Sequence, residues 1–273
     1  MNLTATKKLA AASEDPVAPS LVAMKRRIVF ESEGAILFDI GDGVACFKHK
    51  TKMNIYDRNV FAAIGIALVE TAKSFRALVI VNDHPRAFSC GADLAFFLGR
   101  MKAGDYAALE AFLIDGQERF FAHKYAASPV VAAASGLALG GGRETLLQAH
   151  GIVANANLRA GMPEASLGIL PGWGGCTQMI VRWRRREGVA RGALASLVEP
   201  FSLILGSRVS STALEALDFS ALAPVDRIEA NHDDVVVSAK AYAIELAEAD
   251  ARPPPRPARR SRIEGEAHDL FCR

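Results

Sequence analysis

The feature that most constrains this chain is a glycine-dense stretch from Ser128 to Gly175. It opens with a short apolar run, Val130 to Ala134, which suits a buried strand. A turn with four glycines follows, Gly136 to Gly142, and then a predicted helix over 143–148. Glycines at this density let the backbone approach a ligand closely, and the start of a helix offers free N–H groups to negative charge. The stretch therefore predicts an oxyanion site at a helix start.

Two carboxylates, Glu144 and Glu164, follow this turn among apolar and small residues. Each also has a purely structural interpretation, because an acid at a helix start is stabilised by the helix dipole and Glu164 follows Pro163 in a predicted loop. The glycines taken alone favour close packing of a helix on a strand over a ligand site. No Gly-Lys-Ser/Thr sequence follows them, and the turn lies in the middle of the chain, so neither a Walker loop nor a dinucleotide fingerprint is indicated.

Composition narrows the class of protein. The chain has 273 residues, 51% of them hydrophobic, and a formal net charge of +2, which is typical of a globular protein. This net charge argues neither for nor against a nucleic-acid partner, and we expect none. The four cysteines are scattered and show no metal-ligand spacing, which favours a reduced, cytoplasmic protein without a zinc site. No apolar run approaches the roughly 20 residues that span a membrane.

The order of predicted elements indicates repeated β/α winding. Three short apolar runs joined by Gly/Asp turns predict consecutive hairpin strands, and a helix, a buried strand and a long helical segment follow them. The predicted strands are 28–30, 35–40, 44–47, 77–81 and 130–134, and the predicted helices are 57–75, 95–125, 143–148, 176–183 and, with a break at 223–226, 207–249. We divide the chain into a flexible arm (1–26), a core (27–205), a helical C-terminal region (206–250) and a Pro/Arg-rich tail (251–273).

Three motifs in this order carry a resemblance. Residues 87–94 read AFSCGADL, residues 129–144 read PVVAAASGLALGGGRE, and residues 161–175 read GMPEASLGILPGWGG. Together they resemble the crotonase (enoyl-CoA hydratase/isomerase) superfamily over about residues 28–249. Segments 39–44, 51–54 and 170–176 resemble most closely the hydratase module that is fused to 3-hydroxyacyl-CoA dehydrogenases, although no dehydrogenase G-x-G-x-x-G is present.

The resemblance implies an α/β fold, the crotonase spiral of repeated β-β-α units, whose helical C-terminal region makes the contacts of a homotrimer or hexamer. It implies that the backbone N–H groups of Cys90 and Gly141 form an oxyanion hole, and that Glu144 and Glu164 are the acid/base pair. The remaining substrate contacts implied by the motifs are Ala87, Ser89, Gly91, Ala92, Asp93, Leu94 and Gly140. No metal or separate cofactor is expected, because coenzyme A is part of the substrate, and no membrane partner is expected.

The expected activity is hydration of a 2-enoyl-CoA thioester, as in fatty-acid β-oxidation. The alternatives are a Δ3-Δ2 enoyl-CoA isomerase and a non-catalytic acyl-CoA-binding relative. One departure from the family pattern is Arg143, which stands where a small or apolar residue is usual and is interpreted as a surface residue or an ion-pair partner. Among the other side chains, Asp93 is interpreted as a cap, Trp173 as packing, and the Cys90 thiol as a small buried group rather than a nucleophile.

Overall fold

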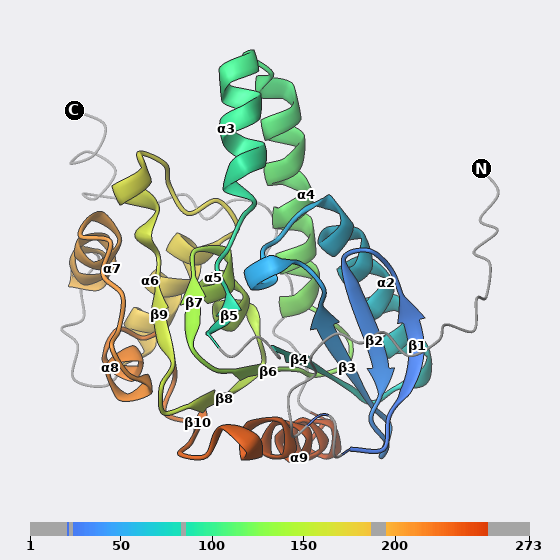
Figure 1. Cartoon of the computed structure of the whole chain (residues 1–273). Coiled ribbons are helices and arrows are strands. Elements are labelled where there is room, and N and C mark those ends of the chain that lie inside the picture. Colours follow the sequence, from blue (N-terminus) through green and yellow to red (C-terminus); the bar gives the residue numbers. More distant parts are fainter. Residues whose placement is uncertain (1–20, 22–23, 83–85, 187–194, 251–273) are drawn as a thin grey trace.

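The computed structural model describes residue 21 and residues 24–82, 86–186 and 195–250 (Figure 1). Most of the predicted arm over 1–26 and the whole of the predicted tail over 251–273 lie outside these ranges. Within them, no helix is both long and apolar enough to cross a bilayer.

The described strands form two sheets. The larger sheet has the order β1-β2-β3-β4-β6-β8-β10, and the smaller has the order β5-β7-β9. The strands of the larger sheet are β1 (Arg27–Glu31), β2 (Ala35–Asp39), β3 (Val44–His49), β4 (Ala77–Val81), β6 (Val130–Ala134), β8 (Gly151–Asn155) and β10 (Arg227–Glu229). Those of the smaller sheet are β5 (Ala87–Ser89), β7 (Leu137–Leu139) and β9 (Arg159–Gly161).

The first three strands confirm the predicted hairpins. β1, β2 and β3 pair antiparallel, and from β3 onward each neighbour in the larger sheet is parallel. The β2–β3 connection is tight because Gly41, Asp42 and Gly43 all have positive φ, a conformation that glycine and aspartate accept more readily than other residues. A parallel sheet needs crossover connections, and helices supply them here.

The helices between the strands complete a repeating unit. They are α2 (Arg58–Ser74), α3 (Leu94–Ala103), α4 (Tyr106–Lys124), α5 (Gly141–Gln148) and α6 (Gly175–Arg185), followed by α7 (Ala195–Leu205), α8 (Ala213–Asp218) and α9 (Val235–Glu248). Each of β4, β6 and β8 is followed by a short strand of the smaller sheet and then by helical structure. The predicted succession of β-β-α units is therefore confirmed.

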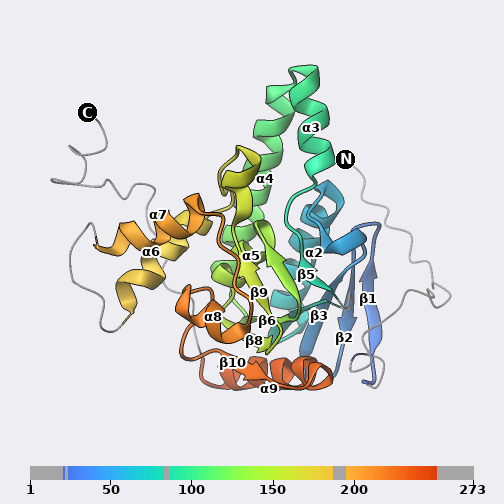
Figure 2. The ribbon, with the colours of Figure 1, turned by 60° about the vertical axis from the view of Figure 1, so that its left-hand side comes forward.

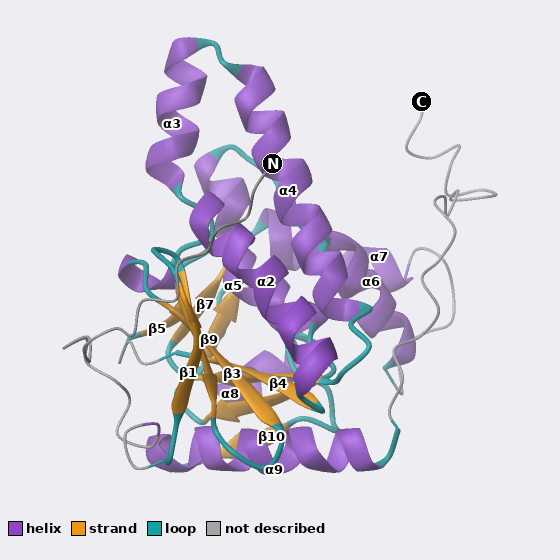
Figure 3. Ribbon diagram, turned by 90° about the vertical axis from the view of Figure 1, so that its right-hand side faces the viewer, coloured by secondary structure: helices purple, strands orange, loops and turns teal. Residues whose placement is uncertain are grey.

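The larger sheet is buried on both faces. Alternate residues of its strands enter two separate hydrophobic clusters: Leu37 and Phe47 belong to the cluster that includes α2 and α4, whereas Ile36 and Cys46 belong to the cluster that includes α9. Figures 1 and 3 show α9 lying along the bottom of the molecule against the strands. We expected the C-terminal helix to serve oligomerisation, but its buried face packs against the larger sheet of the same chain. The expected oligomer stays a prediction.

Several elements were not predicted. The long helical segment is two helices, because Gly104 adopts a left-handed conformation (φ 67°) that ends α3. Figures 1 and 2 show the α3–α4 pair projecting from the body of the molecule. β8 and the smaller sheet were missed, and β10 lies within the segment predicted as mostly helical. β10 pairs with β8, so the region 206–250 completes the same sheet as the core.

Candidate active site

The predicted catalytic residues surround one cavity of about 650 Å³. It lies between the start of α5, the loop after β5, the projecting helices and the 3-10 helix η2 (Pro163–Leu167). Of the residues implied by the motifs, those that line it are Cys90, Gly91, Ala92, Leu94, Gly140, Gly141, Glu144 and Glu164. Ala87, Ser89 and Asp93 do not line it, and their expected role as substrate contacts stays a prediction.

These three residues support the cavity instead of lining it. Ala87 and Ser89 are buried in β5, and the Ser89 hydroxyl accepts a hydrogen bond from the Gly91 N–H (3.1 Å). Asp93 is the N-cap of α3, and its carboxylate accepts from the N–H groups of Ala95 and Phe96 (3.0 and 3.1 Å). The prediction that Asp93 is a cap is thus confirmed, and the cap fixes the direction in which the chain leaves the loop.

The backbone of the loop corrects one predicted donor. The Cys90 N–H donates to the Met53 carbonyl (3.1 Å), so it is not free to bind a substrate oxygen as we expected. Tyr56 pairs with the loop as in a parallel sheet: its N–H donates to the Gly91 carbonyl (2.8 Å), and its carbonyl accepts from the Asp93 N–H (3.0 Å). In that pattern the Ala92 N–H points away from Tyr56, and it has no acceptor among the described residues. The free donor of this loop is therefore at Ala92.

The second donor is Gly141, the first residue of α5. Its N–H precedes the first intrahelical hydrogen bond and has no acceptor within the part of the chain that the structure describes. The two segments pass very close to each other, because a Cβ on Gly91 would lie 2.9 Å from the Leu139 carbonyl oxygen and 3.1 Å from the Gly141 nitrogen. With φ of 86°, Gly91 also has a conformation that side chains disfavour. Glycine at this position thus lets the loop and the helix start line one cavity.

Glu144 is fixed by the start of another helix. It lies in the first turn of α5, is 1% exposed, and its Oε1 accepts from the N–H groups of Trp173 (2.9 Å) and Gly175 (2.7 Å). Gly175 is the first residue of α6, so the carboxylate lies at the positive end of that helix. Burial nevertheless raises the pKa of Glu144 to about 7, with the nearby charge of Glu164 acting in the same direction and the two N–H donors opposing it.

Glu164 has fewer partners. It follows Pro163 in η2, is 8% exposed, and its buried Oε2 has no hydrogen-bond partner within the described ranges. Its Oε1 lies over the α5 start, because a Cβ on Gly140 would be only 2.8 Å from it. Burial raises the pKa of Glu164 to about 7, and the positive charge of Arg143 acts against this rise. Both glutamates therefore titrate near neutral pH beside the same cavity.

The other candidate groups are structural. Trp173, which we predicted to be packing, is 3% exposed and lies among the rings of Tyr56, Phe61, Phe112 and Phe120.

Burial raises the pKa of the Cys90 thiol, which disfavours the thiolate that a nucleophile needs. His49 and His123 are buried core residues whose pKa burial lowers to about 3 and about 4. Among the described residues no group of three or more His, Cys, Asp or Glu side chains is placed to hold a metal ion.

Arg143 is not at the surface, as one of our two interpretations had it. Its side chain is 1% exposed, and no carboxylate of the described residues lies within 4 Å to pair with it, so the ion-pair interpretation is also wrong in this structure.

Asn54 was missed by the sequence analysis. Its side-chain amide donates to the carbonyls of Ala87 and Phe88 (both 3.1 Å) and so holds β5 and the loop that follows it.

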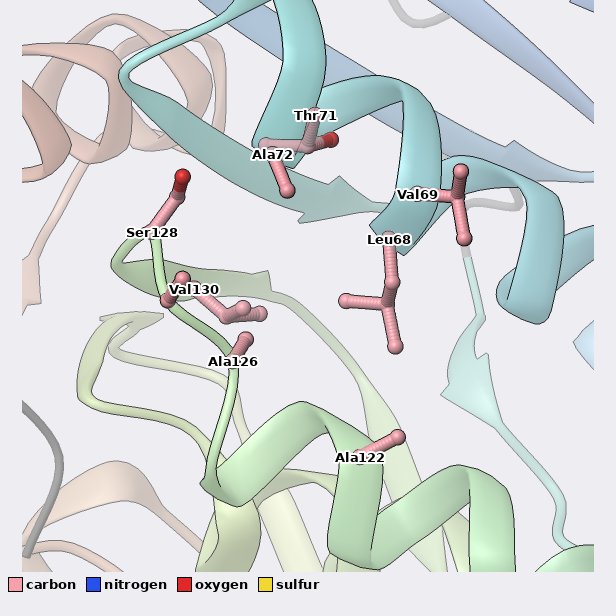
Figure 4. A pocket seen from close by; sticks show the side chains of 9 residues that line it. Leu68, Val69, Thr71, Ala72, Ala122, Ala126, Ser128 and Val130 are labelled. Atoms are coloured by element: carbon pink, nitrogen blue, oxygen red, sulfur yellow. The ribbon is translucent and has the colours of Figure 1, made fainter.

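Two other cavities carry no catalytic candidates. An apolar groove of about 200 Å³ lies between α2 and the end of α4, lined by residues such as Leu68, Ala122 and Val130 (Figure 4). A third, of about 720 Å³, is lined by Lys124, His150 and three of the arginines at 182–186. Of these arginines, Arg182 donates to the carbonyls of Ala221 and Leu146, which explains its burial without a ligand.

Comparison with known proteins identifies the family. The family model described as enoyl-CoA hydratase/isomerase matches residues 40–190, more than half of the chain, and this range includes Ala92, Gly141, Glu144 and Glu164. The chain belongs to this family. Its fold is the crotonase spiral, as two crystal structures show: the enoyl-CoA hydratase of Geobacillus kaustophilus HTA426 (TM-score 0.67, 20% identity, covering 80% of this chain and 76% of that one) and that of Bacillus anthracis (TM-score 0.61, 22% identity, 80% and 76%).

Closer relatives in sequence are larger proteins. A Bacillus subtilis (strain 168) protein named as a 3-hydroxyacyl-CoA dehydrogenase is 32% identical over 227 residues, which are 83% of this chain but 28% of that protein. A Rickettsia felis protein named as a trifunctional enzyme of a fatty acid oxidation complex is 37% identical over 161 residues, 59% of this chain and 22% of that one. The chain thus spans about a quarter of the length of the curated relatives it matches.

Proposed function

We propose that this member of the enoyl-CoA hydratase/isomerase family adds water across the double bond of a 2-enoyl-CoA thioester. One observation carries the proposal: a single, mainly apolar cavity is lined by two buried glutamates and by two residues, Ala92 and Gly141, whose backbone N–H groups have no acceptor among the described residues. The N–H pair suits a thioester oxygen on which negative charge develops. The glutamates suit the two proton transfers that hydration needs.

The reaction follows from the charges. Attack of water on C3 moves the electrons of the double bond toward the thioester oxygen and builds an enolate-like charge on it. Each preorganised N–H donor stabilises such a charge by about 3–4 kcal/mol, judged from donor removal in other enzymes. The ionised glutamate takes a proton from the attacking water, and the protonated glutamate gives its proton to C2. One proton enters the carboxylate pair and one leaves it, so the pair ends with the proton count it began with.

Two pKa values near 7 support these roles. Burial keeps one carboxyl protonated close to neutral pH, while the other is available as a base. No redox cofactor or metal is required by this step, and coenzyme A enters as part of the substrate. By analogy with the larger relatives, the chain would act as the hydratase module of fatty-acid β-oxidation.

An isomerase is the second candidate. Moving a double bond from Δ3 to Δ2 needs one group that takes a proton from C2 and returns it to C4. We favour hydration because both glutamates line the same cavity and both titrate near 7. A non-catalytic acyl-CoA-binding role would leave the two buried carboxylates without a purpose.

The test uses crotonyl-CoA and follows the loss of enoyl-thioester absorbance. Glu144→Gln and Glu164→Gln should each slow hydration by a factor of about 10² to 10⁴, the range of a general acid or base. Glu110→Gln, an exposed glutamate of α4, is the matched control and should keep the wild-type rate. Turnover of a 3-enoyl-CoA only would identify the isomerase, and binding without turnover of either thioester would identify the non-catalytic role.

We also propose a homotrimer or hexamer and a cytoplasmic location. Three cysteines in the described ranges, Cys46, Cys90 and Cys176, are free thiols, which suits a reducing compartment. Light scattering during size-exclusion chromatography measures the oligomer, and a monomeric mass would refute the first part of this proposal.

A further inference from the structure

Arg143 is a buried cation with no carboxylate within 4 Å of its guanidinium among the described residues. It follows Gly142 in the first turn of α5, and its guanidinium donates to the Phe219 carbonyl at the end of α8 (2.8 Å). Its Nε is buried and has no hydrogen-bond partner in the described part of the chain. Arginine is almost never fully buried unless it is paired, because removing its charge from water costs several kcal/mol. Something further away must therefore balance this charge.

The charged groups around Arg143 leave one candidate. From α6, Arg182 repels it, but Arg182 is itself balanced by Asp226, whose Oδ2 lies 3.9 Å away. From η2, Glu164 attracts it. Glu164 lies over Gly140 at the start of the same helix turn, and its Oε2 is without a hydrogen bond. Cys176 of α6 lies near both Glu144 and Glu164, but its thiol carries no charge, because burial raises its pKa and the two carboxylates act in the same direction. The balancing charge therefore lies in the Glu144–Glu164 pair.

The net charge of Arg143, Glu144 and Glu164 together depends on how many protons the two glutamates hold. Burial lowers the pKa of Arg143 to about 10, so the guanidinium remains charged at neutral pH. If both glutamates are protonated, the group carries +1. If one is ionised, it is neutral, and if both are ionised, it carries −1. Without Arg143 the neutral state would have two protonated glutamates. In a low-dielectric interior the neutral state is favoured, because net charge is costly there.

We propose that Arg143 is a positioning residue whose buried charge sets the proton count of the Glu144–Glu164 pair at one. The inference rests on the proposed function for its meaning: hydration needs one ionised and one protonated carboxyl at the same time. Arg143 touches neither the substrate cavity nor the reacting atoms; it acts through the pair.

The kinetic test is the pH profile of crotonyl-CoA hydration in Arg143→Met. Without the positive charge of Arg143, the glutamate pair should hold its second proton to higher pH. The acid limb of the pH–rate profile should therefore move to higher pH by about one unit, the low end of the pKa shift that an opposite charge causes. The turnover lost near neutral pH should then return at higher pH. Arg143→Lys should keep the acid limb of the wild type, and so should Arg185→Met, the matched control on the exposed end of α6. An equal loss at every pH with unmoved limbs would mean a structural role only.

A stability cycle tests the coupling without any activity. Urea unfolding of the wild type, Glu164→Gln, Arg143→Met and the double variant should show a coupling of about 1.4 kcal/mol at pH 8, which is one pKa unit converted. At pH 5 the coupling should vanish, because Glu164 is then protonated. Equal coupling at both pH values, or none at pH 8, overturns the inference.

A third measurement requires no substitution of Arg143, and so it decides the question if Arg143→Met does not fold. The measurement is the proton uptake that accompanies refolding from urea at pH 7. It should be larger by about one proton per chain in the wild type than in a Glu144→Gln/Glu164→Gln double variant, and this difference is the proton held by the pair. Zero or two protons would refute the proposal. Absence of hydration with an intact stability cycle would refute the proposed function alone.

Discussion

Replacing Glu144 by glutamine should stabilise the folded protein at high pH while it removes activity. In the folded chain, burial raises the pKa of Glu144 from its ordinary value of 4.5 to about 7. The folded state therefore holds this proton more tightly than the unfolded state. The stability that the protonated group contributes is fully present below about pH 4.5 and is lost as the pH rises through 7.

The magnitude follows from the two pKa values. A difference of about 2.5 pH units between the folded and the unfolded chain corresponds to about 3 kcal/mol of unfolding free energy. Glutamine has the same shape and cannot ionise, and its side-chain oxygen can still accept from the N–H groups of Trp173 and Gly175. Glu144→Gln should therefore escape this loss and be more stable than the wild type at pH 9 by a few kcal/mol.

The assay is urea unfolding of the wild type, Glu144→Gln and Glu110→Gln between pH 4.5 and 9. The difference between the wild type and Glu144→Gln should grow with pH across this window, while Glu110→Gln, altered at an exposed position, follows the wild type. Parallel curves for the wild type and Glu144→Gln would refute the reasoning, because they would mean that Glu144 ionises as easily in the folded chain as in the unfolded one.

Three further substitutions test the support of the site. Gly91→Ala should lower the turnover of crotonyl-CoA at least about 10²-fold, because its Cβ would lie 2.9 Å from the Leu139 carbonyl and push the loop from the helix start; unchanged kinetics would contradict the close approach. Asn54→Ala should cost about 1–3 kcal/mol in urea unfolding by leaving two buried carbonyls unsatisfied, and a neutral result would show that water replaces the amide. Trp173→Ala should cost about 3–5 kcal/mol, a loss expected of a buried aromatic ring, and thermal unfolding measures it; a stability like that of the wild type would mean that the ring cluster closes around the gap.

Much of the fold could be predicted because its pattern is local. Short apolar runs separated by Gly/Asp turns identify β1, β2 and β3, and spacing of apolar residues identifies α2. β10 could not be predicted, because its three residues pair with β8 some 70 positions earlier in the chain and no local pattern marks them. The short strands of the smaller sheet were missed for the same reason: they are defined by their neighbours in space.

The candidate site divides in the same way. The three motifs pointed to Glu144, Glu164 and Gly141 through their resemblance to the family, whereas each residue alone also had a structural interpretation. The sequence analysis placed the expected oxyanion donor at Cys90, whereas the structure leaves the N–H of Ala92 free in this loop. The pairing of Tyr56 with the loop fixes which N–H groups point away from it, and the Met53 carbonyl takes the Cys90 N–H.

The sequence by itself thus determined the family and the repeated β-β-α plan, and it predicted the two candidate carboxylates. Only the tertiary structure decided their ionisation, because a pKa depends on burial and on charges contributed by other segments. It placed the carboxylate of Glu144 at the start of α6 and buried the Arg143 guanidinium with no carboxylate of the described residues within 4 Å. A sequence records which side chains are present, whereas desolvation, direction of N–H groups and distance between charges arise only when distant segments pack together.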